Sequence, residues 1–176
     1  DAWLSDADKE QFLEGCVRLR KEHALVMSDV ENDAFRDPAS ELVPRFEAWR
    51  TRYLGDYDKA WGGLALANAW EWYARYEIAL WDPLWRAADD DLCLGGPVDG
   101  IPGFAWEHAM SAYVGESNAG GDNEMLATML TRVVVPRLEA LAQAYDAYSA
   151  METTAALQVV EQVSYVVEKT PMRSLL

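Results

Sequence analysis

Two histidines, His23 and His108, are the residues best suited to acid–base or metal chemistry in this sequence of 176 residues. Each follows a glutamate, Glu22 or Glu107. On a helix, adjacent residues lie on different faces, so neither Glu–His pair can converge on one substrate or metal ion. The spacings typical of metal sites, such as His-x-x-x-His and Cys-x-x-Cys, are missing from the sequence. We therefore expect both histidines to be core or rim residues, with no catalytic residue, cofactor or metal site.

A run of aspartates, Asp89, Asp90 and Asp91, is the best candidate for binding Mg²⁺. It is similar to the aspartate-rich motifs of all-α prenyl-chain enzymes. Those motifs need a further aspartate one helical turn later to share the ion, but Cys93 and Leu94 follow here. An acidic loop start is the favoured interpretation. An all-α Mg²⁺-dependent enzyme that uses the Asp89–Asp91 loop remains an alternative hypothesis.

Glycine pairs and hydroxyl side chains offer weaker chemistry. The pairs at 95–96 and 120–121 lack the Lys-Ser/Thr and the strand-then-helix setting of a phosphate-binding loop, so we interpret them as turns. Ser149, Thr153 and Thr154 have no activating base near them in sequence. We predict that Ser149 caps a helix and that Glu152 completes a capping box. The sequence therefore favours a protein that is not an enzyme.

Composition and charge narrow the classes of partner. The length predicts one domain, 1–176, which we expect to be a piece of a longer protein. Acidic residues number 30 against 15 basic ones, a formal charge of −15. Nucleic acid binding depends on basic residues that neutralise phosphates, so we expect no direct binding to DNA or RNA. The aromatic content favours protein partners instead. No apolar run approaches the roughly 20 residues of a membrane helix, so no membrane association is expected.

The two cysteines, Cys16 and Cys93, lie far apart in the sequence. In a chain with no sign of secretion, two distant cysteines are more often reduced core thiols than a disulfide. We also see no signal peptide at the start of the chain. The cysteines are therefore expected to be reduced.

The segment from Tyr57 to Leu84 organises the predicted fold. It is rich in tryptophan, and its apolar residues fall on two helical faces, which predicts a central helix covered on both sides. Gly62 and Gly63 predict close approach of another helix, and a break is expected near Asn68 or Trp70. The Asp82-Pro83 step predicts a boundary. The tryptophans of this region are Trp61, Trp70, Trp72, Trp81 and Trp85, and the two faces are Trp61, Leu64, Asn68, Trp72 and Trp70, Tyr73, Glu77, Leu80.

The central helix also contains the candidate partner-binding residues. Trp70 and Trp72 lie about 200° apart on a helix, so both cannot face the same core. An exposed tryptophan would mark an interface with another protein. A buried Arg75 would need a carboxylate partner. Our candidates for contact with a partner are Trp70, Trp72, Tyr76 and Trp81.

The other segments also show helical patterns, and none shows the alternation of a strand. We predict an all-α fold, with antiparallel helical hairpins around the tryptophan-rich helix, of which a solenoid-like stack is one form. A kink is expected at Pro136, which cannot donate to the carbonyl of Arg132. The expected helices are 1–30, 37–53, 84–88, 104–114, 122–148 and 149–169. Their predicted N-caps are Ser5 for the first, Asp37 or Ser40 for the second and Asp122 or Asn123 for the helix 122–148, and Gly55 is expected to end the second helix. The predicted buried stripes are Phe12, Cys16, Leu19, His23 and Val26 in 1–30; Leu42, Phe46, Trp49 and Tyr53 in 37–53; and Ala156, Val160, Val163 and Val167 in 149–169. The connections 31–37, 89–103 and 115–122 are expected to be loops, the last of them mobile.

Three blocks of motifs cover most of the chain. They are Arg45-Phe46-x-x-Trp49-Arg50, Tyr57-x-x-Ala60, Leu64-x-Leu66, Arg75-x-Glu77 and Trp81-Asp82-Pro83-Leu84 in the first block; Phe104-Ala105-Trp106 and Tyr113-Val114-Gly115 in the second; and Val133-Val134-Val135-Pro136-Arg137-Leu138 and Tyr145-Asp146-Ala147-Tyr148-Ser149 in the third. Together they resemble the GC-rich sequence DNA-binding factor-like (GCFC) domain family. The family often has prolines where Ala67 and Trp72 stand, and Trp-Asp-Pro in place of Tyr145-Asp146-Ala147, which indicates a divergent member.

The resemblance implies a nuclear, non-enzymatic scaffold that needs no cofactor. Members of the GCFC family are associated with pre-mRNA splicing, in particular with disassembly of the intron-lariat spliceosome. There they accompany a G-patch protein, a DEAH-box helicase and other spliceosomal proteins, which are the partners implied here. Some members were named as transcription factors. A transcription-linked regulatory or DNA-associated factor is therefore the alternative that the resemblance leaves open.

Overall fold

The computed structural model describes residues 5–84, 100–115 and 119–169, and it contains helices and no strand within these ranges. The all-α prediction is therefore confirmed. The elements are α1 (Asp6–Leu25), α2 (Asp33–Arg36), α3 (Pro38–Arg52), α4 (Leu54–Lys59), α5 (Gly62–Ile78), the 3₁₀ turn η2 (Ile101–Gly103), α6 (Ala105–Val114), the 3₁₀ segment η3 (Ala119–Glu124), α7 (Met125–Met129), the π-helical η4 (Leu130–Val134), α8 (Val135–Ala142) and α9 (Ala150–Lys169). Residues 85–88 of the predicted helix 84–88 and residues 89–99 of the predicted loop 89–103, with Trp85, Asp89–Asp91, Cys93 and the glycine pair 95–96, lie outside the described residues.

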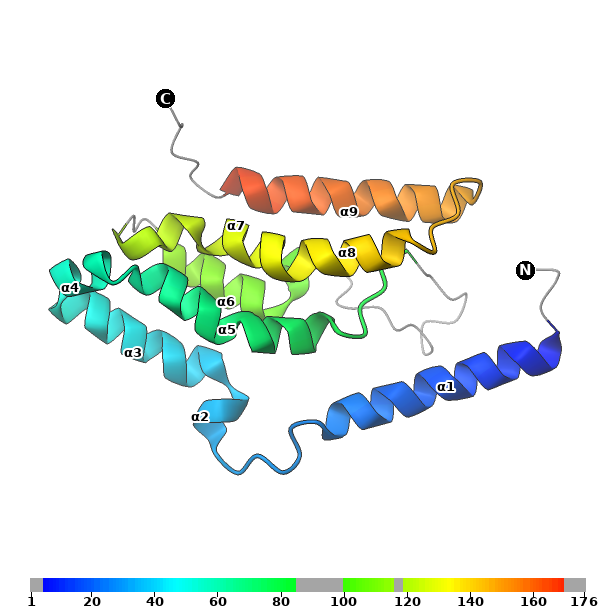
Figure 1. The fold of residues 1–176 in the computed structure, drawn as a ribbon, viewed down its shortest axis with the longest axis horizontal. Coiled ribbons are helices and arrows are strands. Elements are labelled where there is room, and N and C mark those ends of the chain that lie inside the picture. The colour runs from blue at the N-terminus through cyan, green and yellow to red at the C-terminus, as the bar shows by residue number, and fades with distance from the viewer. Residues whose placement is uncertain (1–4, 85–99, 116–118, 170–176) are drawn as a thin grey trace.

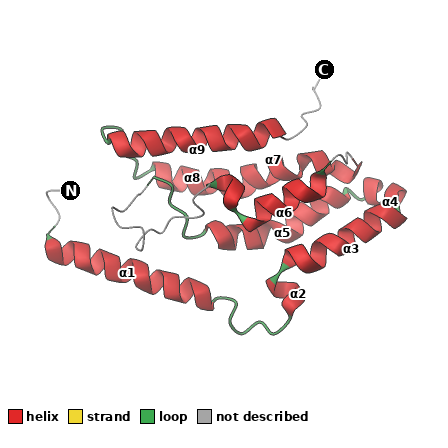
Figure 2. Ribbon diagram, turned by 180° about the vertical axis from the view of Figure 1, so that it is seen from behind, coloured by secondary structure: helices red, strands yellow, loops and turns green. Residues whose placement is uncertain are grey.

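The helices from α3 onward gather around α5, and α3 and α9 run opposite in direction to α5 and to α7–α8 (Figure 1). Helix α5 contacts α3, α4, α6, α7, η3 and η4, and α9 packs outside α7 and η2. Figure 2 shows α6 on the opposite side of α5 from the view of Figure 1. Because the helices surround one central element rather than repeating a unit, the solenoid-like form is not confirmed. None of the described helices combines the length and apolar character needed to cross a bilayer.

The start of α5 is set by the glycine pair predicted to allow close approach. The segment from Tyr57 is divided at Trp61, which has a left-handed backbone (φ 54°). A Cβ on Gly62 would lie 2.2 Å from the ring of Tyr57, and one on Gly63 would lie 2.7 Å from the backbone of Asp122. Close approach is therefore confirmed, although the approaching backbone belongs to η3. The predicted break near Asn68 or Trp70 is wrong: α5 is continuous, because no glycine or proline interrupts it after Gly63.

One face of α5 forms the centre of the core, which it shares with α6, α7 and η4. The other face differs from the prediction that the helix is covered on both sides. Trp61 and Trp72, on that face, are 56% and 46% exposed. The largest fully buried side chains include Tyr57, Leu66, Ile101, Trp106, Met110, Met125, Met129, Val133, Val134 and Val166.

The segment 115–122 was predicted to be a mobile loop whose Asp122 or Asn123 caps the next helix. Its described part forms η3, in which Gly120 and Gly121 have positive φ and are buried. The side chain of Asp122 is fully buried and does not cap α7, whose N-terminus has no side-chain cap. Instead, Asp122 accepts hydrogen bonds from Tyr57 Oη (2.5 Å) and Arg50 Nη1 (2.8 Å). The cap prediction is wrong because the carboxylate pairs with residues distant in sequence.

The irregularity expected at Pro136 takes the form of the π-helical η4 just before it. Pro136 has no N–H to donate to the Arg132 carbonyl, and Nη2 of Arg75 donates to that carbonyl at 2.7 Å. An arginine of α5 thus supplies a donor that the proline removes. The predicted helix 122–148 is shorter than expected: α8 ends at Ala142, and Tyr148 is 99% exposed.

The first helices begin where predicted, but their bounds and faces differ. Ser5 caps α1 in a capping box with Asp8, and Asp37 caps α3. Within the predicted stripe of α1, however, Phe12, Leu19 and Val26 are about half exposed and only Cys16 is buried, because α1 runs away from the helical body (Figure 1). The prediction that Gly55 ends the second helix is wrong, since α3 already ends at Arg52 with Tyr53 as its C-cap and Gly55 lies inside α4. The stretch 31–37 contains the short α2 rather than loop alone, and Tyr53 of the predicted α3 stripe is exposed.

Helix α9 also shows a correct cap and a shifted stripe. Ser149 Oγ accepts from the backbone N–H of Glu152 at 3.3 Å, as predicted for an N-cap. The carboxylate of Glu152 accepts from the N–H of Asp146 rather than closing the box on Ser149. The buried residues are Ala155, Val159 and Val166, whereas Val160 of the predicted stripe is 61% exposed. The buried face of α9 is therefore rotated about the helix axis relative to the predicted stripe. On this face the side-chain oxygen of Gln162 accepts a hydrogen bond from the backbone N–H of Ile101.

Candidate functional site

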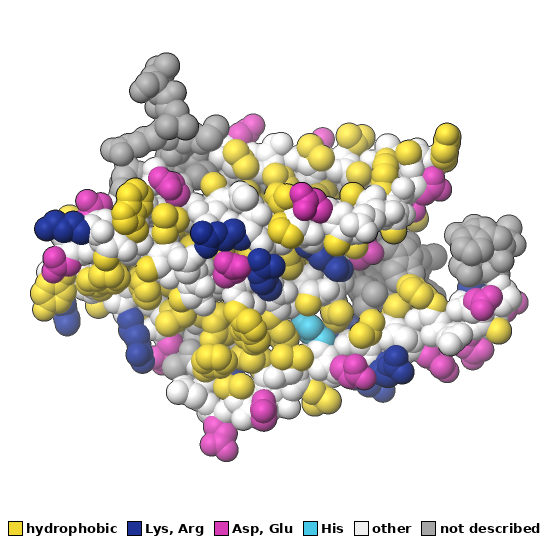
Figure 3. All heavy atoms as spheres, viewed as in Figure 1, with side chains coloured by type: hydrophobic (Ala, Val, Ile, Leu, Met, Phe, Trp, Pro, Cys, Tyr) yellow, Lys and Arg dark blue, Asp and Glu magenta, His cyan; other side chains and the backbone are white. Residues whose placement is uncertain are grey.

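Four aromatic side chains form a cluster on the outer side of α5, which we call the aromatic face: Phe35 of α2 with Trp72, Tyr73 and Tyr76 of α5. The ring centroids of Trp72 and Tyr73 lie 5.1 Å apart, and that of Phe35 lies 6.2 Å from Trp72 and 5.8 Å from Tyr73. In Figure 3 hydrophobic side chains gather here in a yellow patch beside a histidine. The spacing of residues 72, 73 and 76 along one helix places their rings together at the surface.

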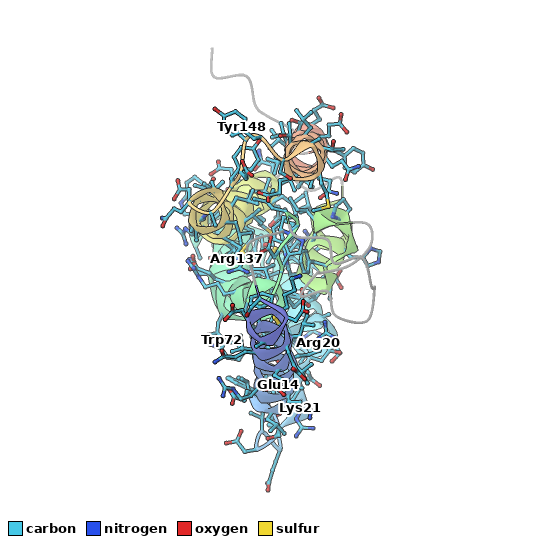
Figure 4. The ribbon with its side chains drawn as sticks, turned by 90° about the vertical axis from the view of Figure 1, so that its right-hand side faces the viewer. Glu14, Arg20, Lys21, Trp72, Arg137 and Tyr148 are labelled. Carbon is cyan, nitrogen blue, oxygen red and sulfur yellow. The ribbon has the colours of Figure 1, made fainter. Side chains whose placement is uncertain are left out.

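Trp72 is the one tryptophan of this cluster, and 46% of its surface is exposed. Its ring stacks on Tyr76 at 5.8 Å with an interplanar angle of 4°. In the end-on view of Figure 4, Trp72 lies toward the edge of the helical body. The stacking fixes the orientation of an indole that still presents a large area to solvent, so little side-chain entropy remains to be lost on binding.

His23 extends the stack and joins α1 to α5. Its ring lies 4.1 Å from that of Tyr76, nearly parallel to it. Nε2 of His23 lies 2.8 Å from the Tyr76 carbonyl oxygen, and Tyr76 Oη donates to the His23 carbonyl at 2.9 Å. His23 is therefore a rim residue with a packing role, whereas His108 is exposed on α6.

The aromatic face borders a shallow hollow of about 340 Å³. Phe35 and Trp72 form two of its walls, and Tyr73 lies between them. The remaining lining residues are Asn32, Leu42 and Ala69. A hollow of this size with aromatic walls suits one or two side chains of a bound polypeptide better than an extended ligand.

On the other side of Tyr73 lies a larger pocket of about 630 Å³, which we call the Glu77 pocket. Burial raises the pKa of Glu77, although backbone N–H groups of Trp106 and Ala105 hydrogen-bond its carboxylate and oppose the rise. Trp106 N donates to Oε2 of Glu77 at 3.2 Å, so Glu77 also serves the N-terminus of α6. Burial likewise raises the pKa of Tyr73.

A polar edge separates the aromatic face from α8. Arg75 pairs with Glu71 at 2.8 Å, and Arg132 lies 3.6 Å from the same carboxylate and hydrogen-bonds Asn68. The carboxylate anticipated for Arg75 is therefore Glu71, but Arg75 is half exposed rather than buried. These contacts fix η4 against α5 and leave the aromatic rings uncovered.

The structure divides the four predicted partner-binding residues into two pairs. Trp70 and Trp81 are 2% and 3% exposed and lie in the core. Trp72 and Tyr76 lie on the aromatic face. Phe35 was not among the candidates, because it stands in a polar stretch that we expected to be a loop. The signal that could have identified it is a single phenylalanine between two predicted helices, and in the structure this side chain is exposed.

The predicted acidic and cysteine candidates for chemistry contribute no described residue to the aromatic face or to the Glu77 pocket. Asp89, Asp90, Asp91 and Cys93 lie outside the described residues. Cys16 is a free, buried thiol whose pKa is raised by burial. Within the described ranges, no group of three or more His, Cys, Asp and Glu side chains could hold a metal ion.

Comparison with known proteins gives distant similarity to one kind of protein. The mouse protein named PAX3- and PAX7-binding protein 1 is 25% identical over 142 residues, which are 78% of this chain and 14% of that protein. The human protein of the same name is 24% identical over 142 residues, with the same shares. The chain thus spans about one seventh of the length of these relatives. No protein-family model and no solved structure matches it.

Proposed function

We propose that this domain is a non-catalytic, protein-interaction scaffold of a nuclear pre-mRNA splicing factor of the GCFC family. In this proposal it acts in disassembly of the intron-lariat spliceosome, together with a G-patch protein, a DEAH-box helicase and other spliceosomal proteins. Two observations on the sequence support it. The motifs at 45–50, 81–84 and 133–138 resemble the family, and the relatives found by comparison are named for binding other proteins.

The exposed Trp72 is the observation that supports partner binding most directly. Tryptophan and tyrosine are enriched among the residues that contribute most to protein interfaces. On the aromatic face one tryptophan and two tyrosines lie together, and Phe35 from α2 completes the surface. Rings that are already packed on one another form such a surface without a rearrangement of α5.

A transcription-linked regulatory factor is the second candidate. The mouse and human relatives are named for binding PAX3 and PAX7, and in this candidate the chain would likewise bind other proteins. This candidate also relies on protein contacts, because the charge of −15 disfavours direct contact with DNA. The two candidates differ in which proteins bind, and one experiment tests both.

The test is affinity purification from nuclear extract with the domain as bait, beside a Trp72→Ala variant. We expect a G-patch protein and its helicase to be recovered with the wild type and to be lost, or reduced at least about tenfold, with the variant. Trp61→Ala is the matched control, since Trp61 is 56% exposed, against 46% for Trp72, but lies at the other end of α5. It should retain the partners.

The identity of the recovered proteins separates the candidates. Recovery of transcription factors without splicing proteins would favour the regulatory role. Equal recovery with wild type and Trp72→Ala would place the binding surface elsewhere. Recovery of no nuclear protein by the folded domain would contradict the scaffold proposal.

A further inference from the structure

The Glu77 pocket has a volume of about 630 Å³, and it opens between the end of α1, the start of α3 and the side of α5. Three aromatic residues and one carboxylate of α5 line it. The other lining residues come from the surrounding elements. The full lining is Ala24, Met27, Ser28, Arg36, Asp37, Pro38, Ala39, Trp70, Tyr73, Tyr76, Glu77 and Ala105. Such a combination of a carboxylate with aromatic walls is suited to a cation.

The carboxylate of Glu77 lacks a cationic partner in the described part of the chain, where no lysine or arginine forms an ion pair with it. Its hydrogen bonds come from neutral backbone N–H groups at the start of α6. A carboxylate removed from water gains from a cation brought within a few ångströms, because the local dielectric is lower than that of water. Glu77 is therefore an acceptor whose charge is only partly compensated.

The other charged groups at the pocket do not fill this role. The Asp37 carboxylate accepts from the N–H groups of Ala39 and Ser40 and so faces the start of α3. Arg36 lies exposed at the mouth without an ion pair to Glu77. Because its charge is positive, Arg36 would repel an incoming cation at the mouth. His23 contacts the rear of Tyr76 and not the carboxylate.

We infer that the Glu77 pocket accepts an arginine side chain from a basic segment of a protein partner. A guanidinium stacks on aromatic rings and binds a carboxylate through two parallel N–H donors, which suits this pocket better than the compact ammonium of lysine. The charge of −15 favours encounter with a basic segment. The pocket shares Tyr73 with the hollow at Phe35 and Trp72, so one segment can occupy both. This inference rests on the proposed scaffold function, whose interface it extends.

The experiment is a selection of binding peptides from a random dodecamer display library, with the domain immobilised. We expect the enriched peptides to share an arginine at a fixed position next to an apolar or aromatic residue. The best peptide is then synthesised with a fluorescent label, and its affinity is measured by anisotropy. Replacing its arginine by lysine should weaken binding, and replacing it by glutamine should weaken binding roughly tenfold or more.

Variants of the domain place the contact in the pocket. Glu77→Gln keeps a side-chain oxygen for the N–H of Trp106 but removes the charge, and it should lower affinity roughly tenfold or more. Glu139→Gln changes the net charge equally at an exposed site on α8 and should change affinity less than about twofold. Arg36→Ala should raise affinity, since it removes the like charge at the mouth.

A second variant tests the pocket without altering Glu77. Ala39→Met adds a side chain at the mouth, and the backbone N–H of residue 39 still reaches Asp37. It should also weaken binding of the arginine peptide. Circular dichroism and a thermal melt check that each variant is folded. If Glu77→Gln unfolds, the Ala39→Met and Arg36→Ala results decide the question.

Three results would overturn the inference: no enriched peptide, enriched peptides without arginine, or an affinity that Glu77→Gln and Ala39→Met leave unchanged. None of them bears on the nuclear pull-down, so the scaffold function is judged separately. Recovery of splicing proteins through Trp72 without any arginine peptide would leave the scaffold standing and remove the pocket from its interface.

Discussion

The two ends of α5 differ in how completely they are covered. At the N-terminal end, Gly62 and Gly63 lie against Tyr57 and Asp122. The buried Asp122 carboxylate and the Tyr57 phenol are hydrogen-bonded within the domain, to Arg50, Tyr113 and each other. At the C-terminal end, Trp72 is half exposed and Glu77 has hydrogen bonds without a cation. We call these the closed end and the open end.

The closed end combines close packing with a buried hydrogen-bond network. Tyr57 Oη lies 2.9 Å from Tyr113 Oη and donates to Asp122, while the Arg50 guanidinium lies 4.2 Å from the centre of the Tyr113 ring. Burial, reinforced by the hydrogen bond to Asp122, raises the pKa of Tyr57 far above its usual range, so the phenol remains a donor. The comparison indicates that the closed end determines stability and that the open end is available for binding.

The largest effect is expected for Asp122→Ala at the closed end. It leaves Arg50 and Tyr57 without their common acceptor, and removing one partner of a buried pair costs about 3–5 kcal/mol. Chemical denaturation monitored by circular dichroism measures the free energy of unfolding. Asp56→Ala, at an exposed site on α4, should cost less than about 0.5 kcal/mol. A loss below 1 kcal/mol for Asp122→Ala would remove the network from our account of stability.

A smaller but still clear loss is expected for Gly63→Ala. The added Cβ would lie 2.4 Å from Oδ1 and 2.7 Å from Cα of Asp122, and overpacking of this kind costs about 1–3 kcal/mol. The matched control is Gly55→Ala in α4, where a Cβ meets no atom within 4 Å. It should stabilise the domain by about 0.4–1 kcal/mol. Effects of the same sign at both glycines would contradict the proposed close approach.

Trp72→Ala should have a small effect on stability, about 1 kcal/mol, because nearly half of the side chain is already exposed. Its neighbour two residues earlier sharpens the contrast: Trp70→Ala removes a core side chain and should cost about 3–5 kcal/mol. Thermal melts of both variants measure the difference. Equal losses would show that the open end contributes to the core after all.

The smallest effect concerns pH. Because burial raises the pKa of Glu77 above its ordinary value of 4.5, the folded state holds this proton more tightly than the unfolded state. The contribution to stability is therefore complete below pH 4.5 and is lost as pH rises through the folded pKa. Glu77→Gln should remove this slope from a series of melts between pH 4 and pH 7, whereas Glu139→Gln should keep it. A Glu77→Gln curve parallel to the wild type would count against a desolvated carboxylate.

Helix caps could be predicted from sequence because they depend on neighbours. The side-chain oxygens of Ser5, Asp37 and Ser149 each accept a hydrogen bond from a backbone N–H two or three residues later in the sequence. The glycine pair at 62–63 was equally informative, since two glycines at the start of an apolar helix have few purposes other than close packing. These features could be predicted because each depends on residues that are close together in the sequence.

The role of Asp122 could not be predicted in this way. Its position before an apolar helix suggested a cap, but its partners Arg50 and Tyr57 are 72 and 65 residues away. The faces of α1 and α9 were misassigned for a related reason: an apolar stripe shows which residues can be buried, but not what the fold places against them. Phe12 and Val160, both in stripes predicted to be buried, are 51% and 61% exposed.

The candidate site was predicted in part. Helical periodicity required that Trp70 and Trp72 face different surroundings, and one is buried and the other exposed. Which of them faces the core depends on the position of α6 and α7 relative to α5, and this is not contained in the periodicity of one helix. Phe35 joins the aromatic face through α2, a helix of four residues that is too short to give a periodic signal.

The distance in sequence between Tyr57 and Asp122 has a consequence during synthesis. The two residues are 65 positions apart, and at roughly 5–20 residues per second a ribosome needs about 3–13 s to pass from one to the other. For that time the glycine face of α5 has been made while the backbone that covers it has not. The nascent domain therefore has a defined interval in which a chaperone can bind this face, and the interval ends when η3 leaves the ribosome.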